Sequence, residues 1–251
     1  MIYAVWASEI PSEGLRLDQR AGGYVLSGRK PFCSGIGIVD RALITVSEPH
    51  ALLLDVDMRG QQERVEADLS RWATSAFLAT KTGAVDFSDF NVTVSDVVGP
   101  EDFYLTRPGF WHGACGPAAC WVGGAKGLVS FANASNRADP HTLAHLGAME
   151  SSLWMMKAAL DRAGDEIDRC DVDNPMLRAL QLRHVIEQGC SDILRRLPRA
   201  FGPYPLAMDS EISRRYQELD LYLRQSHGER DLETIGKVIR DKKARSVPEK
   251  V

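Results

Sequence analysis

The chain has 251 residues, of which 44% are hydrophobic and 25% charged, values typical of a globular protein with one large or two small domains. Its formal net charge of −4 argues against nucleic acid as a main partner. The sequence contains no apolar run of membrane-spanning length, and its first residues lack the basic and long apolar regions of a signal peptide, so no membrane partner is expected.

The five cysteines are an odd number and form no CxxC pair. This usage predicts reduced thiols in a cytoplasmic protein, and it argues against a disulfide framework. Cys115 and Cys120 are isolated from other ligand residues, so no metal site is expected.

The N-terminal part of the chain is rich in short apolar runs. Strands are predicted at 3–6, 24–27, 42–46, 51–56, 83–87 and 91–98. Turn-forming residues separate them at 11–14, 48–50, 59–60 and 88–89. Many short strands at this spacing favour a β-barrel or sandwich domain over residues 1–106.

The hydrophobic period changes after Gly109 to steps of three and four residues. Helices are predicted at 123–134, from 140 to about 160, at 175–197, around 212–223 and from about 232. Pro198 is expected to end the third of them. Because the connecting loops are short, residues 107–251 are predicted to form an antiparallel helical bundle. The expected fold class is therefore α+β, a β-barrel or sandwich domain followed by an antiparallel helical bundle.

Residues 22–45, GGYVLSGRKPFCSGIGIVDRALIT, are predicted to form two strands joined by a turn that carries Phe32, Cys33 and Ser34. The segment resembles the flavin-cradling hairpin of the acyl-CoA dehydrogenase family. In that family a strand of the type GY-x-L-x-G-x-K leads into an aromatic-x-Thr/Ser turn that packs against the isoalloxazine ring. The order of strands followed by antiparallel helices is also similar to the middle and C-terminal domains of the family, over nearly the whole chain.

The resemblance implies a bound FAD and assigns cofactor contacts in the first domain. Phe32 would cover one face of the flavin ring, and Ser34 would supply a hydroxyl near flavin N5 and O4. Cys33 lies between them in the same turn. Core packing is the alternative explanation of Phe32.

A second group of cofactor contacts is implied near the N-terminus. Residues 3–9, YAVWASE, correspond to an aromatic strand that ends in Thr-Glu-Pro in the family, so Trp6 lies in that strand and Ser8 replaces the threonine that bonds the ring. Residues 10–13, IPSE, depart from the small-residue run that lines the pyrophosphate.

In the second domain the resemblance assigns Arg137 to the FAD phosphates of a neighbouring subunit, since a guanidinium matches a diphosphate. A solvated arginine at a helix end is the alternative. Gly202 retains one glycine of a Gly-Gly turn near a partner's pyrophosphate, and Pro203 removes a backbone donor there.

The family's catalytic glutamate is absent from both of its usual positions. Counting from Gly202 without gaps places Ser226 at one, and no acid occurs between Asp102 and Asp139, where the other would lie. The candidates for the catalytic base are His227 and Glu229 in the last helical hairpin and His112 in the loop at 109–113. Structural or surface roles are the alternatives for the two histidines.

Three functions remain open at this stage. The first is an FAD-dependent oxidoreductase of acyl-CoA dehydrogenase type that acts on an acyl-CoA or related thioester. The second is a non-catalytic or half-site subunit, because the family begins with a helical domain and this sequence begins inside the β domain. The third is a flavin-dependent oxygenase of the same fold, which does not need the glutamate. A homodimer, or a heteromer with a related subunit, is expected to cover the apolar surfaces.

Overall fold

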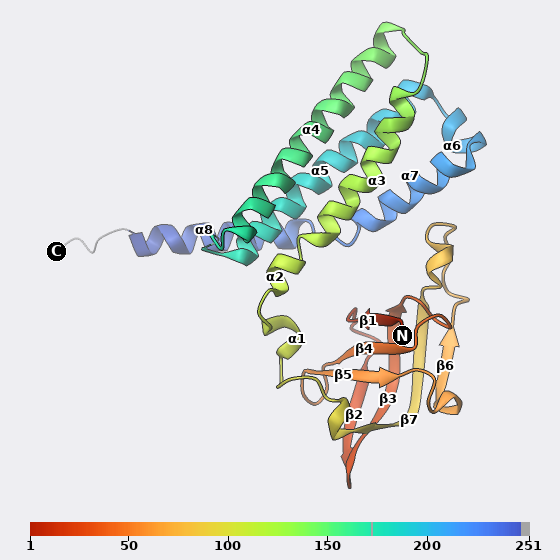
Figure 1. Cartoon of the computed structure of the whole chain (residues 1–251), viewed down its shortest axis with the longest axis vertical. Coiled ribbons are helices and arrows are strands. Elements are labelled where there is room, and N and C mark those ends of the chain that lie inside the picture. The colour runs from red at the N-terminus through yellow and green to blue at the C-terminus, as the bar shows by residue number, and fades with distance from the viewer. Residues whose placement is uncertain (172, 247–251) are drawn as a thin grey trace, which may run out of the picture. The chain divides into compact units, whose positions relative to one another are not determined.

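The computed structural model describes residues 1–171 and 173–246. The chain divides into two compact units, Met1–Phe110 and Trp111–Val251. The first is built of strands and the second of helices (Figure 1). This confirms the predicted α+β class.

The first unit contains two sheets. Its strands are β1 (Tyr3–Trp6), β2 (Leu15–Arg20), β3 (Gly23–Cys33), β4 (Arg41–Val46), β5 (Leu52–Asp57), β6 (Val65–Asp68) and β7 (Gly83–Thr93). One sheet has the order β1-β4-β5, with β1 parallel to β4, and the other has the antiparallel order β2-β3-β7-β6. Short helical segments follow β5, β6 and β7: η1 (Gln62–Arg64), η2 (Leu78–Thr80), and then η3 (Val94–Asp96) with α1 (Phe103–Thr106).

Both sheets contribute to one hydrophobic core. Trp6, Ile44 and Leu54 come from the first sheet, and Leu26 and Phe87 come from the second. Alternating residues of β4 are buried, as expected for a sheet with one face on the core. The core therefore lies between the two sheets, as in a β-sandwich.

Strands β3 and β7 form a long pair that is interrupted twice. Leu26 pairs with Phe90 and Gly28 with Phe87, so Ser88 and Asp89 lie opposite the single residue Ser27. This is a β-bulge, in which Asp89 takes a positive φ of 49°. The turn expected at 88–89 was wrong for this reason, since the two predicted strands around it belong to one strand.

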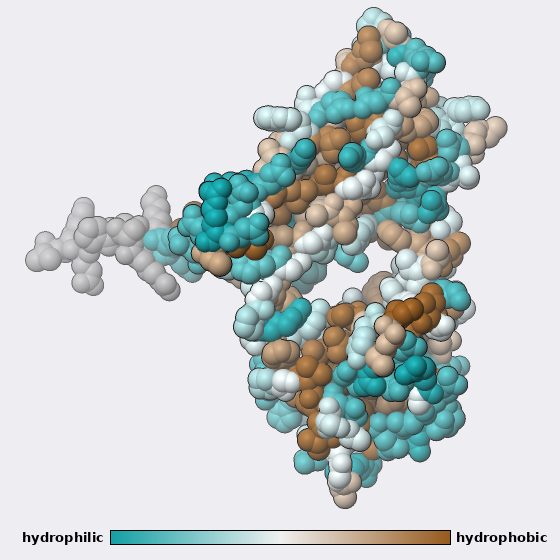
Figure 2. All heavy atoms as spheres, in the orientation of Figure 1, coloured by the Kyte–Doolittle hydropathy of each residue, from teal (hydrophilic) through white to brown (hydrophobic). Residues whose placement is uncertain are grey.

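The second unit is a bundle of helices. They are α2 (Phe110–Gly113), which begins at the last residue of the first unit, α3 (Gly116–Asn133), α4 (Pro140–Asp168), α5 (Pro175–Phe201), α6 (Tyr204–Met208), α7 (Ser210–Leu223) and α8 (Glu229–Ser246). The long helices α3, α4, α5 and α7 run antiparallel to their neighbours in sequence (Figure 1). On the face shown in Figure 2, hydrophobic residues run along the bundle between hydrophilic ones.

The ends of these helices follow local sequence signals. Asp139 caps α4 by accepting a hydrogen bond from Thr142 N at 3.0 Å, and Pro140 occupies the first helical position. The sequence predicted that Pro198 ends α5. In the structure Pro198 instead lies inside the last turn of this helix. A proline there removes one hydrogen bond, and the Gly202 N–H donates to the Pro198 carbonyl at 2.9 Å, which closes the helix end.

Within the described parts of the chain, no helix is both long and apolar enough to cross a membrane. The same residues contain no group of three or more His, Cys, Asp or Glu side chains arranged to hold a metal ion.

Candidate functional site

A second bulge exposes Phe32 at the end of β3. Lys30 pairs with Val85 and Cys33 with Gly83, so Pro31 and Phe32 lie opposite Ala84 alone. Phe32 has φ 54°, a left-handed conformation that is uncommon for a residue with a side chain, and its side chain is 54% exposed. Bulges of this kind redirect a side chain, and here a large aromatic ring is held in solvent.

Hydroxyl groups gather directly after this bulge. Ser34 Oγ lies 2.8 Å from Thr82 Oγ1, and Thr82 Oγ1 lies 2.7 Å from Thr80 Oγ1. Backbone bonds hold the turn against the same segment, since Gly35 N donates to the Thr80 carbonyl at 2.8 Å. Ser34 is exposed and Thr82 is buried, so the cluster runs from the core to the surface.

Trp6 meets this turn from β1. Its indole Nε1 donates to the Ser34 carbonyl at 2.9 Å, and its side chain is buried in the β core. Two predicted residues that are far apart in sequence are therefore in contact. Trp6 supports the turn through its hydrogen bond to the Ser34 carbonyl. Ser8 lies exposed on the segment after β1.

The Cys33 side chain faces the core. Its thiol is fully buried and donates to the Lys30 carbonyl at 3.2 Å. Burial raises the pKa of Cys33 to about 12, although the nearby Lys30 ammonium opposes the shift. A cofactor contact from Cys33 would have to use its backbone.

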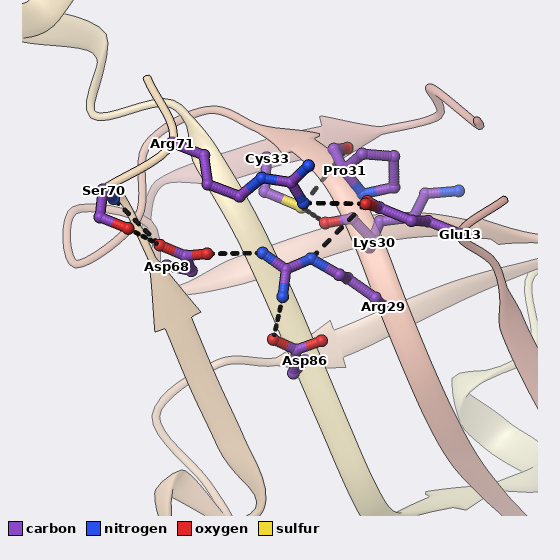
Figure 3. A network of polar contacts seen from close by, with 9 residues as sticks. All are labelled: Glu13, Arg29, Lys30, Pro31, Cys33, Asp68, Ser70, Arg71 and Asp86. Carbon is purple, nitrogen blue, oxygen red and sulfur yellow. Dashed lines mark hydrogen bonds and ion pairs between the residues drawn. The ribbon is translucent and has the colours of Figure 1, made fainter. Parts of the chain in front are cut away.

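Ion pairs hold the segment at 10–13 to the β domain (Figure 3). Glu13 lies 3.6 Å from Arg29 Nε and 2.9 Å from Arg71 Nη1. Arg29 also binds Asp68 at 2.6 Å and Asp86 at 2.9 Å. Glu13, one of the residues in this segment, therefore serves in a network of opposite charges with Arg29 and Arg71.

Lys30, beside Arg29 on β3, is almost fully buried. Its Nζ donates to the carbonyl and the hydroxyl of Thr45 at 2.7 and 3.0 Å and lies 3.6 Å from Glu9 Oε1. Burial lowers the pKa of Lys30, and the Glu9 carboxylate opposes this shift. This lysine anchors β3 to β4.

In the helical unit, Arg137 and the Gly202 turn lie together. The Arg137 guanidinium donates to the Ala200 carbonyl at 3.1 Å, and Thr142 Oγ1 donates to the same carbonyl at 3.2 Å. Arg137 is exposed, and Gly202 has φ 70°, which favours glycine. Loop 134–139 and the end of α5 thus present one guanidinium beside one glycine turn.

The corner between α7 and α8 carries two of the predicted bases. His227 is exposed, and its Nδ1 lies 3.5 Å from Asp231 Oδ1. Glu229 is exposed at the start of α8. His112 is half-buried in α2, where its carbonyl accepts a hydrogen bond from Cys115 N at 3.2 Å.

Sequence reasoning missed Thr82, Arg183 and Asp231. Ser34 and Thr82 are 48 residues apart in the sequence, and no local sequence pattern predicts their contact. Asp231 follows His227 by four residues, a spacing that places both side chains on one side of a helical turn, so this signal was present. Its burial depends on packing that the spacing does not reveal.

The comparison with family models found no match, and the comparison with curated proteins also found none. Solved structures do share the fold. An acyl-CoA dehydrogenase from Slackia heliotrinireducens matches with a TM-score of 0.78 and 16% identity, over 97% of this chain and 68% of that chain. One from Geobacillus kaustophilus matches with a TM-score of 0.81 and 16% identity, over 94% and 68%.

A dibenzothiophene monooxygenase from Paenibacillus has the same fold, with a TM-score of 0.73 and 16% identity, over 92% of this chain and 68% of that chain. This chain therefore spans about two thirds of the length of each of these structures. Identity at this level establishes a common fold, and it leaves the chemistry to be argued from the residues themselves.

Proposed function

We propose that this chain, which has the fold of the β and C-terminal helical domains of acyl-CoA dehydrogenases, is a flavin-dependent oxidoreductase that acts on an acyl thioester. The observation that carries the proposal is the bulged turn after β3. It carries the exposed Phe32 two residues before Ser34, whose hydroxyl belongs to the cluster with Thr82 and Thr80.

The chemistry of this turn fits a flavin. An exposed aromatic ring can stack on a flat heterocycle, and the Ser34 hydroxyl can donate to a ring nitrogen or carbonyl. Bound at this turn, a flavin would supply the acceptor for a hydride from the substrate. The Ser34 backbone, supported by Trp6, would keep the hydroxyl in place.

FAD is favoured over a mononucleotide by Arg137. Its guanidinium is exposed beside the Gly202 turn and is suited to a diphosphate. Since the resemblance assigns this arginine to a neighbouring subunit's cofactor, the proposal includes a homodimer or a heteromer with a related subunit.

His227 is proposed as the base that removes the α proton of the thioester. It is the exposed imidazole at the corner where the resemblance places the glutamate, and Asp231 lies beside it. The absence of the glutamate, with Ser226 at its usual position, favours a second candidate function, a flavin-dependent oxygenase, which does not need that residue. The monooxygenase among the structures of this fold is compatible with that candidate.

The first test is flavin binding by the purified protein, measured by its visible absorbance and by titration of the flavin-free form. We expect Ser34→Ala to weaken flavin binding about three- to tenfold, the loss of roughly one hydrogen bond. Ser27→Ala, on the same strand, is the matched control. A protein that remains colourless with added FAD contradicts the proposal.

The second test separates the two reactions. Anaerobic addition of acyl-CoA thioesters of several chain lengths is expected to bleach the bound flavin, because the substrate itself is the reductant. If flavin binds and no thioester bleaches it, the dehydrogenase is excluded in favour of the oxygenase, which requires an external reductant and O₂.

A further inference from the structure

The carboxylate of Asp231 is buried within the helical unit. The residue lies in the first turn of α8, and its side chain is 11% exposed, whereas the side chain of its partner His227 is 59% exposed. An ordinary pair on a helix surface keeps both groups in water. Here the acid is inside and the imidazole is outside, which is the arrangement of a base and the group that orients it.

A cation from α5 supports the buried carboxylate. The Arg183 guanidinium donates to the Gln225 carbonyl at 2.8 Å and to the Ala114 carbonyl at 3.4 Å, and it lies 4.9 Å from the centre of the Trp121 ring. Burial lowers the pKa of Arg183, and the Asp231 carboxylate opposes this shift. Arg183 thus ties the corner at 224–228 to α3 and α5 while balancing the charge of Asp231.

Other ionisable groups around this cluster come from neighbouring elements. Tyr222 on α7 and Cys115 before α3 interact electrostatically with Arg183, and Glu229 and Arg230 precede Asp231 on α8. Burial raises the pKa of both Tyr222 and Cys115, which favours their neutral forms near neutral pH.

We infer that Asp231 is a positioning residue, which holds His227 with a proton on Nδ1 and the lone pair of Nε2 facing solvent. A carboxylate 3.5 Å from Nδ1 attracts the N–H of that nitrogen and selects this tautomer. The inference deepens the proposed function, on which its catalytic part rests.

In the proposed reaction, the C–H bond α to the thioester carbonyl breaks and its proton bonds to His227 Nε2. A flavin held at the Ser34 turn would supply the acceptor for the hydride of the β carbon, and the electron pair of the broken α bond would form the carbon–carbon double bond. The substrate would thus lose one proton and one hydride, with the flavin as the oxidant. Asp231 remains ionised throughout and contacts only the Nδ1 side of the ring.

The tautomer can be measured without any turnover. In the full-length protein labelled with ¹⁵N-histidine, long-range ¹H–¹⁵N spectra distinguish the two nitrogens of His227, and His227→Gln assigns its signals. We expect the neutral ring to carry its proton on Nδ1. We expect Asp231→Asn to shift the ring toward the Nε2–H form, whereas Asp220→Asn, an exposed acid on α7, leaves the spectrum unchanged.

A wild-type ring protonated on Nε2, or an identical tautomer in wild type and Asp231→Asn, overturns the inference. The wild-type spectrum alone decides the first point, so the test survives if Asp231→Asn does not fold. The spectrum is also independent of flavin. A protein that binds no flavin but shows the Nδ1–H tautomer contradicts the proposed function and upholds the pairing.

The catalytic part is tested by the rate of anaerobic flavin reduction by the thioester. We expect Asp231→Asn to slow it about 10- to 100-fold with little change in KM, because the ring is no longer held with Nε2 as its acceptor. Asp231→Glu is expected to recover part of the rate. Unchanged rates in both Asp231→Asn and His227→Gln overturn the catalytic role.

Discussion

Arg29 illustrates how single residues organise the β domain. It contacts three carboxylates, those of Glu13, Asp68 and Asp86, which come from the loop before β2, from β6 and from β7 (Figure 3). Asp68 in addition accepts hydrogen bonds from the hydroxyl and the backbone N–H of Ser70. The network joins one edge of the sheet to the loop that precedes it.

This network predicts a dependence of stability on pH. Hydrogen bonds from Ser70 and Arg29 lower the pKa of Asp68 from 3.8 to about 2. The folded-state pKa is below the unfolded one, so the stabilisation is present above about pH 4 and is lost as the pH falls toward 2. We expect Asp68→Asn to reduce the slope of unfolding free energy against pH in that window, measured by urea unfolding. Asp18→Asn, in an exposed pair on β2, is the control, and an unchanged slope contradicts the assignment.

At the scale of elements, helix starts are encoded locally and strand pairings are not. Asp209 caps α7 by accepting hydrogen bonds from Glu211 N and Ile212 N, both at 3.0 Å. This cap sets where α7 begins, and so it bears on the corner that carries His227. Caps of this kind are read from a few neighbouring residues.

Asp209→Ala is therefore expected to destabilise the helical unit by about 1 kcal/mol, the usual cost of removing an N-cap. Asp209→Asn should retain most of the stability, since asparagine caps about as well as aspartate. Urea unfolding followed by helical circular dichroism measures both. Equal losses in the two variants would show that the aspartate acts through its charge and not as a cap.

The strands show what local patterns leave out. The hydrophobic alternation located β1, β4 and β5 but missed β2, whose LRLDQR sequence is mostly polar. β2 is a strand because it pairs with β3, and its composition alone does not predict one. The residues at 88–89 have turn chemistry, yet they form a bulge because β3 continues opposite them.

At the scale of the whole molecule, each unit has its own hydrophobic core, and apolar residues also remain exposed. On α4, Trp154 is 75% exposed and Met155 44% exposed. Exposed aromatic and methionine side chains are typical of protein–protein interfaces. We therefore assign this part of α4 to the interface of the proposed homodimer or heteromer.

We expect the purified chain to sediment as an oligomer of its 27.7 kDa subunit, and Trp154→Arg to shift it toward the monomer. The charged side chain would be costly to bury in an apolar interface. Val94→Arg, at an apolar residue that is 65% exposed in the β domain, is the matched control. Sedimentation velocity at several concentrations measures both variants. A monomeric wild type, or an oligomer indifferent to Trp154→Arg, contradicts the assignment.

The sequence by itself determined the α+β class and the positions of the long helices. These depend on periodicity and caps, which act between near neighbours. The turn predicted at Phe32, Cys33 and Ser34 was wrong in part, because Phe32 and Cys33 belong to the bulged end of β3 and β3 and β4 lie in different sheets. The tertiary structure decided that Ser34 meets Thr82, that Arg137 meets the Gly202 turn through Ala200, and that Asp231 is buried beside Arg183. Such contacts join residues far apart in the chain, and burial depends on what every packed element contributes, so no local pattern contains them.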